Sequence, residues 1–405
     1  MIIVQGEGEL SREHLTHWKN SYTRIAVIHP DKESAEKISG KLDGVVEFEL
    51  TAERSPGPKG TYPKDLLDTV IKKLRVPAEG VILVSEDPWF MSSGRTMGLA
   101  MVIGIREKTP GKRKLYDQGA NLVLERLEDI SVYRGEDAPF SFIQLLPNVF
   151  TDLNKFETPF HDKEPVFFLD YDGTLTPIVK DPSRAFLPEN TRDLLEELAR
   201  LYTVAVVSGR DMDDIKHFIK LDQIIYAGSH GFRISGPRGL YMEHEAARAL
   251  LSRLDQFEKH LRNTLEKKIN GVEVERKHFA IAVHYRNAPP ASLDLIRKET
   301  DQLLINNKEF RTGTGKKILE IKPSIKWHKG KAVEWIMDKL DLSDSEKYVP
   351  VYVGDDVTDE DAFRTISDDG IGILAGTHSL PSAAHYQLKN VDQVKKFLHY
   401  MVHSA

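Results

Sequence analysis

Short apolar runs alternate with amphipathic stretches along most of the chain, which has 405 residues. In its first part, four runs rich in Val, Ile and Leu predict buried strands. They cover residues 24–29, 81–85, 100–105 and 121–124. The stretches at residues 32–42 and 63–74 carry apolar residues at helical spacing instead. Because short strands that alternate with helices pair in parallel, we expect an N-terminal α/β domain over residues 1–155.

The same alternation begins again after a polar, aperiodic segment at residues 150–164. A strand that starts at Val166 opens this second α/β pattern. Its other strands are expected at residues 203–207, 223–227 and 349–353, and its helices at residues 187–201, 211–219, 329–340 and 359–366. The pattern predicts a Rossmann-like α/β core in two pieces, residues 160–236 and 324–405.

A different pattern occupies residues 237–323, between the two pieces of the core. Two runs of alternating apolar and polar residues, 272–277 and 279–285, predict antiparallel strands with one wet face. The other expected elements are a long helix at residues 244–269, a helix at 293–304 and a strand at 317–322. We therefore expect a small α+β module inserted into the core.

The composition is that of an ordinary globular protein, with 40% hydrophobic and 29% charged residues. The chain has no cysteine, which excludes disulfides, thiolate metal sites and a cysteine nucleophile. Its net charge of −6 and lack of a dominant basic face argue against a nucleic-acid partner. No stretch approaches the ~20 apolar residues of a membrane span, and the first residues do not resemble a signal peptide. We expect a cytoplasmic protein without a membrane partner; nothing in the sequence indicates its oligomeric state.

Two carboxylates follow the apolar run that begins at Val166, in the segment Asp170-Tyr171-Asp172-Gly173-Thr174. Residues two apart on a strand point the same way, so both acids are expected to face one site. Two adjacent carboxylates repel unless a cation lies between them or one is protonated. The segment therefore indicates a divalent metal beside a nucleophile and a proton donor. The alternative is a strand that ends in an ordinary polar turn.

A second acidic segment, Gly354-Asp355-Asp356-Val357-Thr358-Asp359-Glu360, follows another apolar strand. Several acids this close together require a cation or solvent, and grouped oxygen ligands suit magnesium. A solvated acidic helix cap is the alternative. In an open parallel sheet, ligands collect at the carboxyl ends of the strands, so this segment and Asp170 are expected to share one metal.

Two further segments could bind a phosphoryl group. Ser208-Gly209-Arg210 follows a strand and precedes a helix, where backbone amides favour anions; an ordinary capping serine is the alternative. Lys329 opens a helix, although acids are the residues normally favoured at a helix start. This basic start indicates function, against the alternative of a solvated lysine, and Lys331 competes with Lys329 for the role.

Taken together, these four segments resemble the four motifs of the haloacid dehalogenase superfamily of phosphatases, in the same order and with room for a cap between the second and third. Within that superfamily the chain is similar to the trehalose-6-phosphate phosphatase family over about residues 160–400. The similarity rests on Gly354 to Phe363, Gly228 to Gly231, Glu275 to Lys277, His284 to Arg286 and Glu320 to Pro323. It implies that residues 237–323 are a substrate-specificity cap.

The resemblance also implies roles for individual residues. Asp170 would attack phosphorus and form an aspartyl-phosphate, while Asp172 would protonate the leaving sugar oxygen and then activate water. Ser208 and Lys329 would hold the phosphoryl oxygens. The implied magnesium ligands are Asp170, the Asp172 carbonyl and Asp355, with Asp356 or Asp359 acting through a water. The implied substrate-binding residues are Thr174, Gly209, Arg210, His230, Glu275, Lys277, Arg286 and Glu320.

The function that follows is magnesium-dependent hydrolysis of trehalose 6-phosphate to trehalose and phosphate. Three alternatives stay open from the residues alone. One is a phosphatase of another sugar phosphate, such as that of sucrose, glucosylglycerol or mannosylglycerate. Another is a catalytically silent sugar-phosphate sensor, which the paired acids Asp170 and Asp172 disfavour. The third is a receiver-like signalling domain, which the inserted module disfavours.

The N-terminal domain resembles the closing half of a second haloacid dehalogenase-like domain, in residues 81–105 and 119–129. No segment before it resembles the nucleophile segment Asp170 to Thr174. His29-Pro30-Asp31 follows the first predicted strand but lacks the paired acids. We therefore expect a degenerate, noncatalytic domain that serves assembly, regulation or stability.

Overall fold

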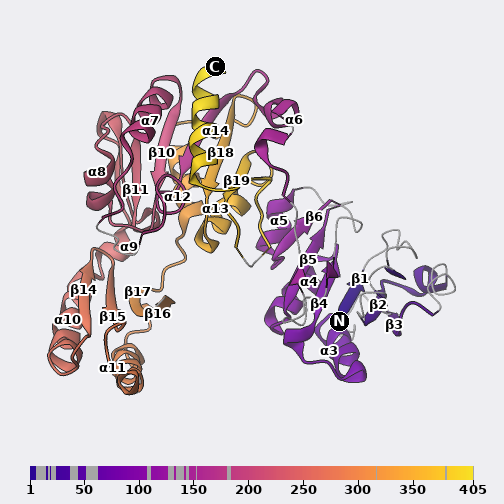
Figure 1. Cartoon of the computed structure of the whole chain (residues 1–405). Helices are drawn as coiled ribbons and strands as arrows, with labels where there is room; N and C mark the ends of the chain where they lie inside the picture. The colour runs from indigo at the N-terminus through magenta and orange to yellow at the C-terminus, as the bar shows by residue number, and fades with distance from the viewer. Residues whose placement is uncertain are drawn as a thin grey trace. The chain divides into compact units, whose positions relative to one another are not determined.

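A computed structural model describes residues 1–5, 15–16, 19, 24–36, 44–51, 63–106, 111–125, 132–133, 141–142, 146–151, 153–179, 184–315, 317–378 and 381–404. The chain divides into two compact units (Figure 1). The first comprises Met1–Phe156 and Phe363–Gln387, and the second comprises Glu157–Ala362 and Leu388–Ala405. No helix in the described part of the chain is long and apolar enough to cross a membrane.

The first unit contains a six-stranded sheet in the order β3-β2-β1-β4-β5-β6, and every pair in it is parallel. Its strands are β1 (Ile2–Gln5), β2 (Ile25–His29), β3 (Phe48–Thr51), β4 (Ile82–Ser85), β5 (Met101–Ile105) and β6 (Leu122–Leu124). Its helices and short elements are α3 (Pro63–Leu74), η1 (Ala78–Gly80), α4 (Pro88–Thr96), α5 (Lys112–Asp117), β7 (Val132–Tyr133), β8 (Ser141–Phe142), η3 (Val149–Thr151) and α6 (Leu153–Glu157). The four predicted strands correspond to β2, β4, β5 and β6. Residues 32–36 are helical, and the rest of the helix predicted at residues 32–42 lies outside the described residues.

The central strand β1 and the edge strand β3 do not stand out in the sequence. β1 has only four residues and β3 contains Glu49, so neither gives a long apolar run. In the structure, Ile2 and Val4 of β1 pack with apolar residues of β2, β4 and β5 in one core cluster. β1 is buried throughout its length, as expected for a parallel strand in the centre of a sheet.

An eight-stranded sheet has the order β13-β12-β11-β10-β9-β18-β19-β20. Six of its strands, β9 to β13 and β18, belong to the second unit, whereas β19 and the first two residues of β20 fall in the segment Phe363–Gln387. The strands are β9 (Glu164–Leu169), β10 (Thr203–Val207), β11 (Ile225–Gly228), β12 (Arg233–Ser235), β13 (Tyr241–Glu243), β18 (Tyr348–Gly354), β19 (Ile371–Ala375) and β20 (Tyr386–Leu388). The helices are η4 (Thr158–Phe160), α7 (Glu189–Leu201), α8 (Met212–Ile219), η6 (Ser229–Gly231), η7 (Pro237–Gly239), α12 (Lys329–Lys339), η10 (Val357–Asp359), α13 (Glu360–Thr365) and α14 (Val391–His403). The strands β11, β10, β9 and β18 pair in parallel, whereas β12 and β13 are antiparallel. The elements predicted for the core up to residue 366 agree with these bounds to within two residues; the short strands β12 and β13 were not predicted.

The two large sheets repeat one strand order. The first sheet runs β3-β2-β1-β4-β5-β6, and the corresponding part of the second runs β11-β10-β9-β18-β19-β20. In both, the first parallel strand along the chain lies in the centre, next to the fourth. Ligands of open parallel sheets bind at the carboxyl ends of the strands where the order reverses. The ends of β1 and β9 are therefore equivalent places in the two sheets.

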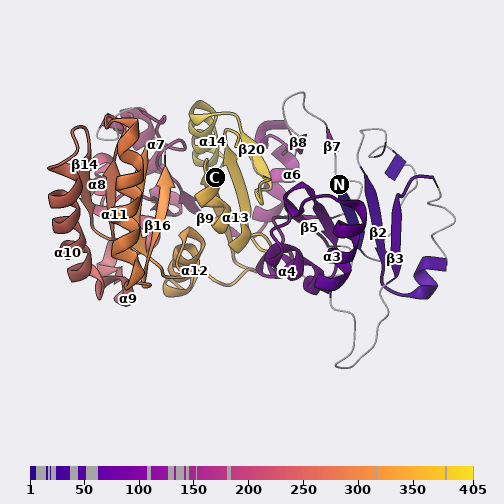
Figure 2. The ribbon, with the colours of Figure 1, turned by 90° about the horizontal axis from the view of Figure 1, so that it is seen from below.

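A four-stranded antiparallel sheet, in the order β14-β15-β17-β16, forms a separate module within the second unit. We call β14–β17 with their helices the four-stranded module. It consists of α9 (Glu245–Arg248), α10 (Leu251–Leu261), η8 (Arg262–Glu266), β14 (Glu273–Lys277), β15 (Ala280–His284), η9 (Pro290–Ser292), α11 (Leu293–Ile305), β16 (Phe310–Gly315) and β17 (Ile318–Pro323). In both views α10 and α11 lie beside the sheet (Figure 1, Figure 2). Their apolar residues pack on one of its faces, through Leu254, Phe257, Leu261, Val274, Ile281, Val283, Ile296 and Ile321.

The single long helix predicted at residues 244–269 is wrong. The structure has α9, α10 and the π-helical segment η8 in its place. Ala247 of α9 packs against Phe232 and Phe279, whereas Leu254 of α10 packs on the four-stranded sheet. A turn at residues 249–250 separates the two helices, and Leu251 at the start of α10 packs against both apolar clusters.

The edge strand β16 was also not predicted. Its sequence, Phe-Arg-Thr-Gly-Thr-Gly, has little apolar alternation and two glycines, which usually weaken a strand. It forms because all six of its residues pair with β17.

Close packing at Gly228 gives a test of the core. A Cβ atom there would lie 2.4 Å from the backbone nitrogen of Met212, at the start of α8. We expect Gly228→Ala to lower the free energy of unfolding by about 2–3 kcal/mol, measured by urea denaturation. At Gly313 a Cβ atom would lie 3.4 Å from the flexible end of Lys322, so Gly313→Ala should change stability by less than about 1 kcal/mol. Equal midpoints for the two variants would contradict the close approach of β11 and α8.

Candidate active site

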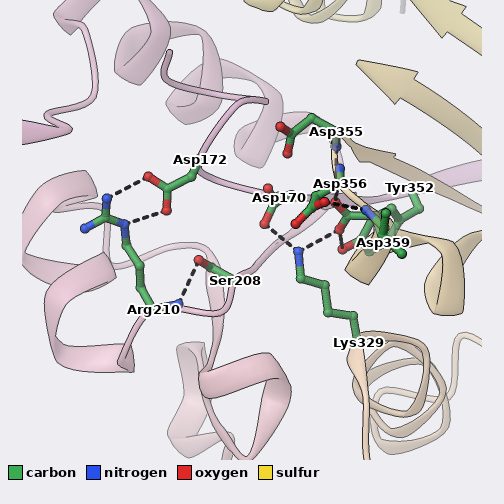
Figure 3. Close-up of polar contacts among 10 residues, drawn as sticks. Asp170, Asp172, Ser208, Arg210, Lys329, Tyr352, Asp355, Asp356 and Asp359 are labelled. Carbon is green, nitrogen blue, oxygen red and sulfur yellow. Dashed lines mark hydrogen bonds and ion pairs between the residues drawn. The ribbon is translucent and has the colours of Figure 1, made fainter. Parts of the chain in front are cut away.

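Asp170 and Lys329 form a buried ion pair at the carboxyl end of the central strand β9. The Asp170 backbone N–H donates to the Val353 carbonyl of β18 at 2.9 Å, which fixes the backbone just after β9. The Lys329 ammonium, from the first residue of α12, donates to Asp170 Oδ1 at 2.7 Å (Figure 3). The two side chains are only 3% and 6% exposed. Lys331 pairs instead with Glu334 on the exposed side of α12, so Lys329 is the lysine that reaches Asp170.

Asp359 is fully buried and accepts four hydrogen bonds. Lys329 Nζ and the Tyr352 hydroxyl donate to Oδ1 at 2.7 and 2.6 Å. The backbone N–H groups of Asp355 and Asp356 donate to Oδ2 at 3.1 and 3.0 Å. A buried carboxylate needs such partners, and here they fasten the loop after β18 to α12.

Burial and crowding shift the pKa values of these groups. Burial raises the pKa of Asp170 well above its ordinary value, and the Lys329 ammonium only partly opposes this. Burial and the charge of Asp359 raise the pKa of Asp355 to about 7. Burial disfavours the charged form of Lys329, but Asp170 and Asp359 outweigh it and raise the Lys329 pKa. One ammonium therefore does not balance the carboxylates around it.

The carboxylates of Asp170, Asp355 and Asp359 each bring one oxygen within 4.8 Å of the others. Gly173, with φ +85°, lies so close to them that a Cβ atom would be 1.9 Å from Asp355 Oδ2. Crowded oxygen ligands fit a divalent cation, because its charge would remove the repulsion that helps to raise the pKa values of Asp170 and Asp355.

The side chains of the other two predicted metal residues, Asp356 and Asp172, have partners outside this group of carboxylates. Asp356 is exposed and caps η10 by accepting from the Val357 N–H at 2.6 Å. β9 ends at Leu169, so strand alternation does not govern the directions of Asp170 and Asp172. The expectation that the two acids point the same way is therefore not met: Asp170 points to Lys329 and Asp172 points to Arg210 (Figure 3).

Asp172 is held by a bidentate ion pair. Arg210 Nε and Nη2 donate to its two carboxylate oxygens, each at 2.6 Å. The guanidinium carbon lies 5.6 Å from the centre of the Tyr171 ring and 5.2 Å from that of Phe218. The paired geometry and the two rings hold Arg210 in one orientation.

Ser208 lies at the end of β10 in a loop that is hydrogen-bonded to the loop after β11. The Ser208 carbonyl accepts from the His230 N–H at 2.8 Å, and the Arg210 carbonyl accepts from the Ser229 N–H at 2.6 Å. A Cβ atom on Gly209 would lie 2.8 Å from His230 Cε1, so the close approach requires glycine. Burial and the charge of Lys329 lower the pKa of His230 to about 4, so this side chain is neutral at pH 7.

Thr174 has a buried hydroxyl oxygen without a hydrogen-bond partner. Such an oxygen is uncommon in a folded protein. Its position in the turn after Asp172 fits the predicted role of contacting a ligand oxygen.

Three of the predicted sugar-binding residues share one face of the four-stranded module. Glu275 and Glu320 both lie opposite Ala282 in the sheet register, and Lys277 is two residues beyond Glu275 on the same strand. Lys277 Nζ lies 3.2 Å from Glu320. Burial opposes the Glu320 charge, but Lys277 and Lys322 outweigh it and lower the Glu320 pKa.

Arg286 is exposed and follows the end of β15, so it is not on the strands that carry Glu275 and Glu320. Two residues of the site were not predicted. Lys322 lies 3.5 Å from Glu320, and its spacing of two from Glu320 on an alternating strand could have revealed it. Tyr352 gave no signal, because a tyrosine inside an apolar strand is typical of a core residue.

The model of the trehalose-phosphatase family matches residues 168–397, which is more than half of the chain. The chain belongs to the trehalose-phosphatase family. The match begins just before Asp170 and includes every residue of the site described above. It confirms the family and the phosphatase class expected from the sequence.

Curated relatives agree with this family. A trehalose-phosphate phosphatase of Mycobacterium tuberculosis is 34% identical over 349 residues, 86% of this chain and 87% of the relative. Probable trehalose-phosphate phosphatase C of Arabidopsis thaliana is 35% identical over 299 residues, 71% of this chain and 92% of the relative. An uncharacterised glycosyl hydrolase of M. tuberculosis is 34% identical over 90% of this chain, but the alignment covers only 27% of that protein. The chain thus spans about a quarter of the length of this last relative.

Solved structures confirm the fold class. The C-terminal domain of C. albicans trehalose-6-phosphate phosphatase covers 64% of this chain and 100% of its own, with a TM-score of 0.52 and 23% identity. A trehalose-6-phosphate phosphatase related protein covers 59% of this chain and 97% of its own, with a TM-score of 0.51 and 23% identity. These similarities show the α/β fold class that the sequence predicts.

The raised pKa of Asp355 predicts that cation binding depends on pH. Below about pH 7 the carboxyl holds a proton that a cation must displace, so the dissociation constant should rise up to about tenfold for each unit of falling pH. Isothermal titration with Mg²⁺ as the probe, at about pH 6 and about pH 8, measures this. Repeating the titration in two buffers with different ionisation enthalpies gives the number of protons released on binding. Equal affinity at both pH values, without proton release, would contradict the crowded site.

Proposed function

We propose that the protein hydrolyses trehalose 6-phosphate to trehalose and phosphate, with Mg²⁺ as its cofactor. The observation that carries this proposal is the arrangement of four side chains at the end of β9. Lys329 holds Asp170 in place, and Asp172 and Ser208 flank Asp170. The substrate is inferred from the family, because its members are named for trehalose phosphate. Phosphoryl transfer depends mainly on positioning and on neutralising charge, and this group provides both.

The proposed reaction has two steps. An Asp170 oxygen attacks phosphorus, the bond from phosphorus to the sugar oxygen breaks, and Asp172, which has taken up a proton from solvent after leaving Arg210, gives that proton to the sugar oxygen. Asp172 then takes a proton from water as the water oxygen attacks the aspartyl-phosphate, which releases phosphate and restores Asp170. Lys329 and the Ser208 hydroxyl bind phosphoryl oxygens throughout. Bound Mg²⁺, held by Asp170 and Asp355, would neutralise charge on the phosphoryl group.

The ion pair between Asp172 and Arg210 must open before Asp172 can take part in this reaction. Both Asp172 oxygens are occupied by the guanidinium, so Asp172 must leave at least one of these bonds to reach the leaving oxygen. A phosphorylated sugar that enters beside Ser208 offers Arg210 other acceptors. We infer that substrate binding itself frees Asp172.

We infer that the charged face of the four-stranded module selects the sugar, so that the module acts as the cap. Glu275, Lys277 and Glu320 present donors and acceptors on one face. A site that hydrogen-bonds hydroxyl groups rejects ligands that lack them, because its own polar groups are then left unpaired. Without a sugar, Lys277 and Glu320 satisfy each other's charge, and a bound sugar would replace this contact.

We infer that the first unit performs no chemistry, although its sheet repeats the strand order of the core. At the end of β1, which corresponds to the end of β9, the last described residue is Gln5, which has no carboxylate. Gln5 accepts a hydrogen bond from Ser85 at 2.5 Å. The helix before the fourth parallel strand begins with Pro63 here and with Lys329 in the core. Within the described residues, the end of β1 therefore brings no carboxylate and α3 does not begin with a lysine.

A panel of sugar phosphates tests the reaction and its substrate. Phosphate release from trehalose 6-phosphate should require Mg²⁺ and should exceed release from the phosphates of sucrose, glucosylglycerol and mannosylglycerate. Asp170→Asn should lower kcat by about 1,000-fold or more, because an amide is not a nucleophile. Equal rates across the panel would contradict the substrate. Activity that survives in Asp170→Asn would mean either that Asp170 is not the nucleophile or that the first unit is active.

The sugar-binding role is tested at Glu320. Glu320→Gln keeps the size of the side chain but removes its charge, and it should lower kcat/KM for trehalose 6-phosphate about 10–100-fold, mainly through KM. Glu273→Gln is the matched control for loss of one charge, because Glu273 is exposed and lies two residues before Glu275, at the end of β14 away from Lys277. If the two variants behave alike in steady-state kinetics, the charged face does not bind the sugar.

A further inference from the structure

Asp211 connects the phosphoryl-binding loop to the four-stranded module. It directly follows Arg210 and is the residue before α8. Its Oδ1 accepts from the Ser229 hydroxyl at 2.7 Å. Its Oδ2 accepts from the backbone N–H of His278 at 2.8 Å, and His278 lies in the turn between β14 and β15. One carboxylate therefore bridges two parts of the second unit that are far apart in the sequence.

This bridge is not an ordinary helix cap. An aspartate in front of a helix usually accepts from the first free N–H groups of that helix. Asp211 occupies this position in front of α8, but its side chain makes no hydrogen bond to the helix. Both of its oxygens instead serve partners outside α8.

Each partner leads to a group with a proposed role. The Ser229 N–H donates to the Arg210 carbonyl, in the loop that holds Ser208 and the Arg210–Asp172 pair. On the other side, His278 directly follows Lys277, whose ammonium lies 3.2 Å from Glu320. The path from the phosphoryl-binding loop to the sugar-facing charges thus passes through Asp211.

The other contacts at this junction set its orientation less strictly. Phe232, Phe279 and Ala247 form a small apolar cluster there, and apolar packing has little directionality. The His278 side chain adds one hydrogen bond to Glu243 at 2.8 Å. The bond from the His278 N–H to Asp211 fixes the backbone of the turn, and bonds to a charged acceptor are the stronger kind.

We propose that Asp211 is a positioning residue that sets the orientation of the four-stranded module over the active site. It does so by holding the turn after Lys277 against the loop that contains Ser208 and Arg210. The distance between the phosphoryl-binding and sugar-binding groups then depends on this one carboxylate. The inference rests on the proposed function, since it assigns the module a substrate to position.

Three variants test it. Asp211→Ala removes both hydrogen bonds. Asp211→Asn keeps both, because its amide oxygen can accept from the His278 N–H while its NH₂ group donates to the Ser229 oxygen. Asp213→Ala is the matched control, since Asp213 belongs to the same helix, is 73% exposed and pairs only with Arg233 of β12 among the contacts of the described residues.

We expect amide exchange at residues 277–279 to speed up about tenfold or more in Asp211→Ala. In the same variant KM for trehalose 6-phosphate should rise about tenfold while kcat changes less. Asp211→Asn and Asp213→Ala should behave like wild type in both measurements. A merely structural role would lower stability without this division between KM and kcat.

Three outcomes would overturn the proposal. The first is unchanged exchange at residues 277–279 in Asp211→Ala. The second is faster exchange without any change in KM. The third is an equal effect in Asp213→Ala, which would indicate loss of charge in α8 rather than loss of the bridge. If wild type releases no phosphate from trehalose 6-phosphate, the proposed function fails instead; the exchange comparison still tests the bridge, and KM is then measured with the sugar phosphate that wild type does hydrolyse.

Discussion

The buried ammonium of Lys329 is the group on which the geometry of the active site depends. It donates to Asp170 and Asp359 at 2.7 Å each, and all three side chains are buried. A buried charge is tolerated only with well-placed partners, so α12, the end of β9 and the loop after β18 must stay together. The same contact turns Asp170 toward the place where a phosphoryl group would bind. Stability and chemistry therefore rest on one interaction.

Chain segments that are distant in sequence meet here because their strands end at one edge of a sheet. β9 brings Asp170, β10 brings Ser208, and β18 brings Asp355. Glycine permits the close approach at Gly173, where a side chain would collide with Asp355. Gly354 has the same function beside Asp359, since a Cβ atom there would lie 2.3 Å from Asp359 Cγ. The chemistry thus needs both the carboxylates and the small residues between them.

The sequence predicted the features that depend on local pattern. Apolar runs located β9, β10 and β18, and the acids at their ends located the site. It could not decide between Lys329 and Lys331, because that choice depends on which side of α12 faces β9. It did not reveal Tyr352 or Asp211, whose roles come from tertiary partners. The turn between α9 and α10 was missed as well.

Trapping of the covalent intermediate tests the proposed role of Asp170 most directly. Wild-type protein is mixed with an excess of trehalose 6-phosphate and Mg²⁺, quenched in acid within milliseconds, and digested for mass spectrometry. We expect one phosphoryl group on the peptide that contains Asp170, and its release by hydroxylamine, as an acyl phosphate requires. Trehalose formed in the same quenched samples without any phosphoryl group on that peptide, or with the group on another residue, would contradict nucleophilic attack by Asp170.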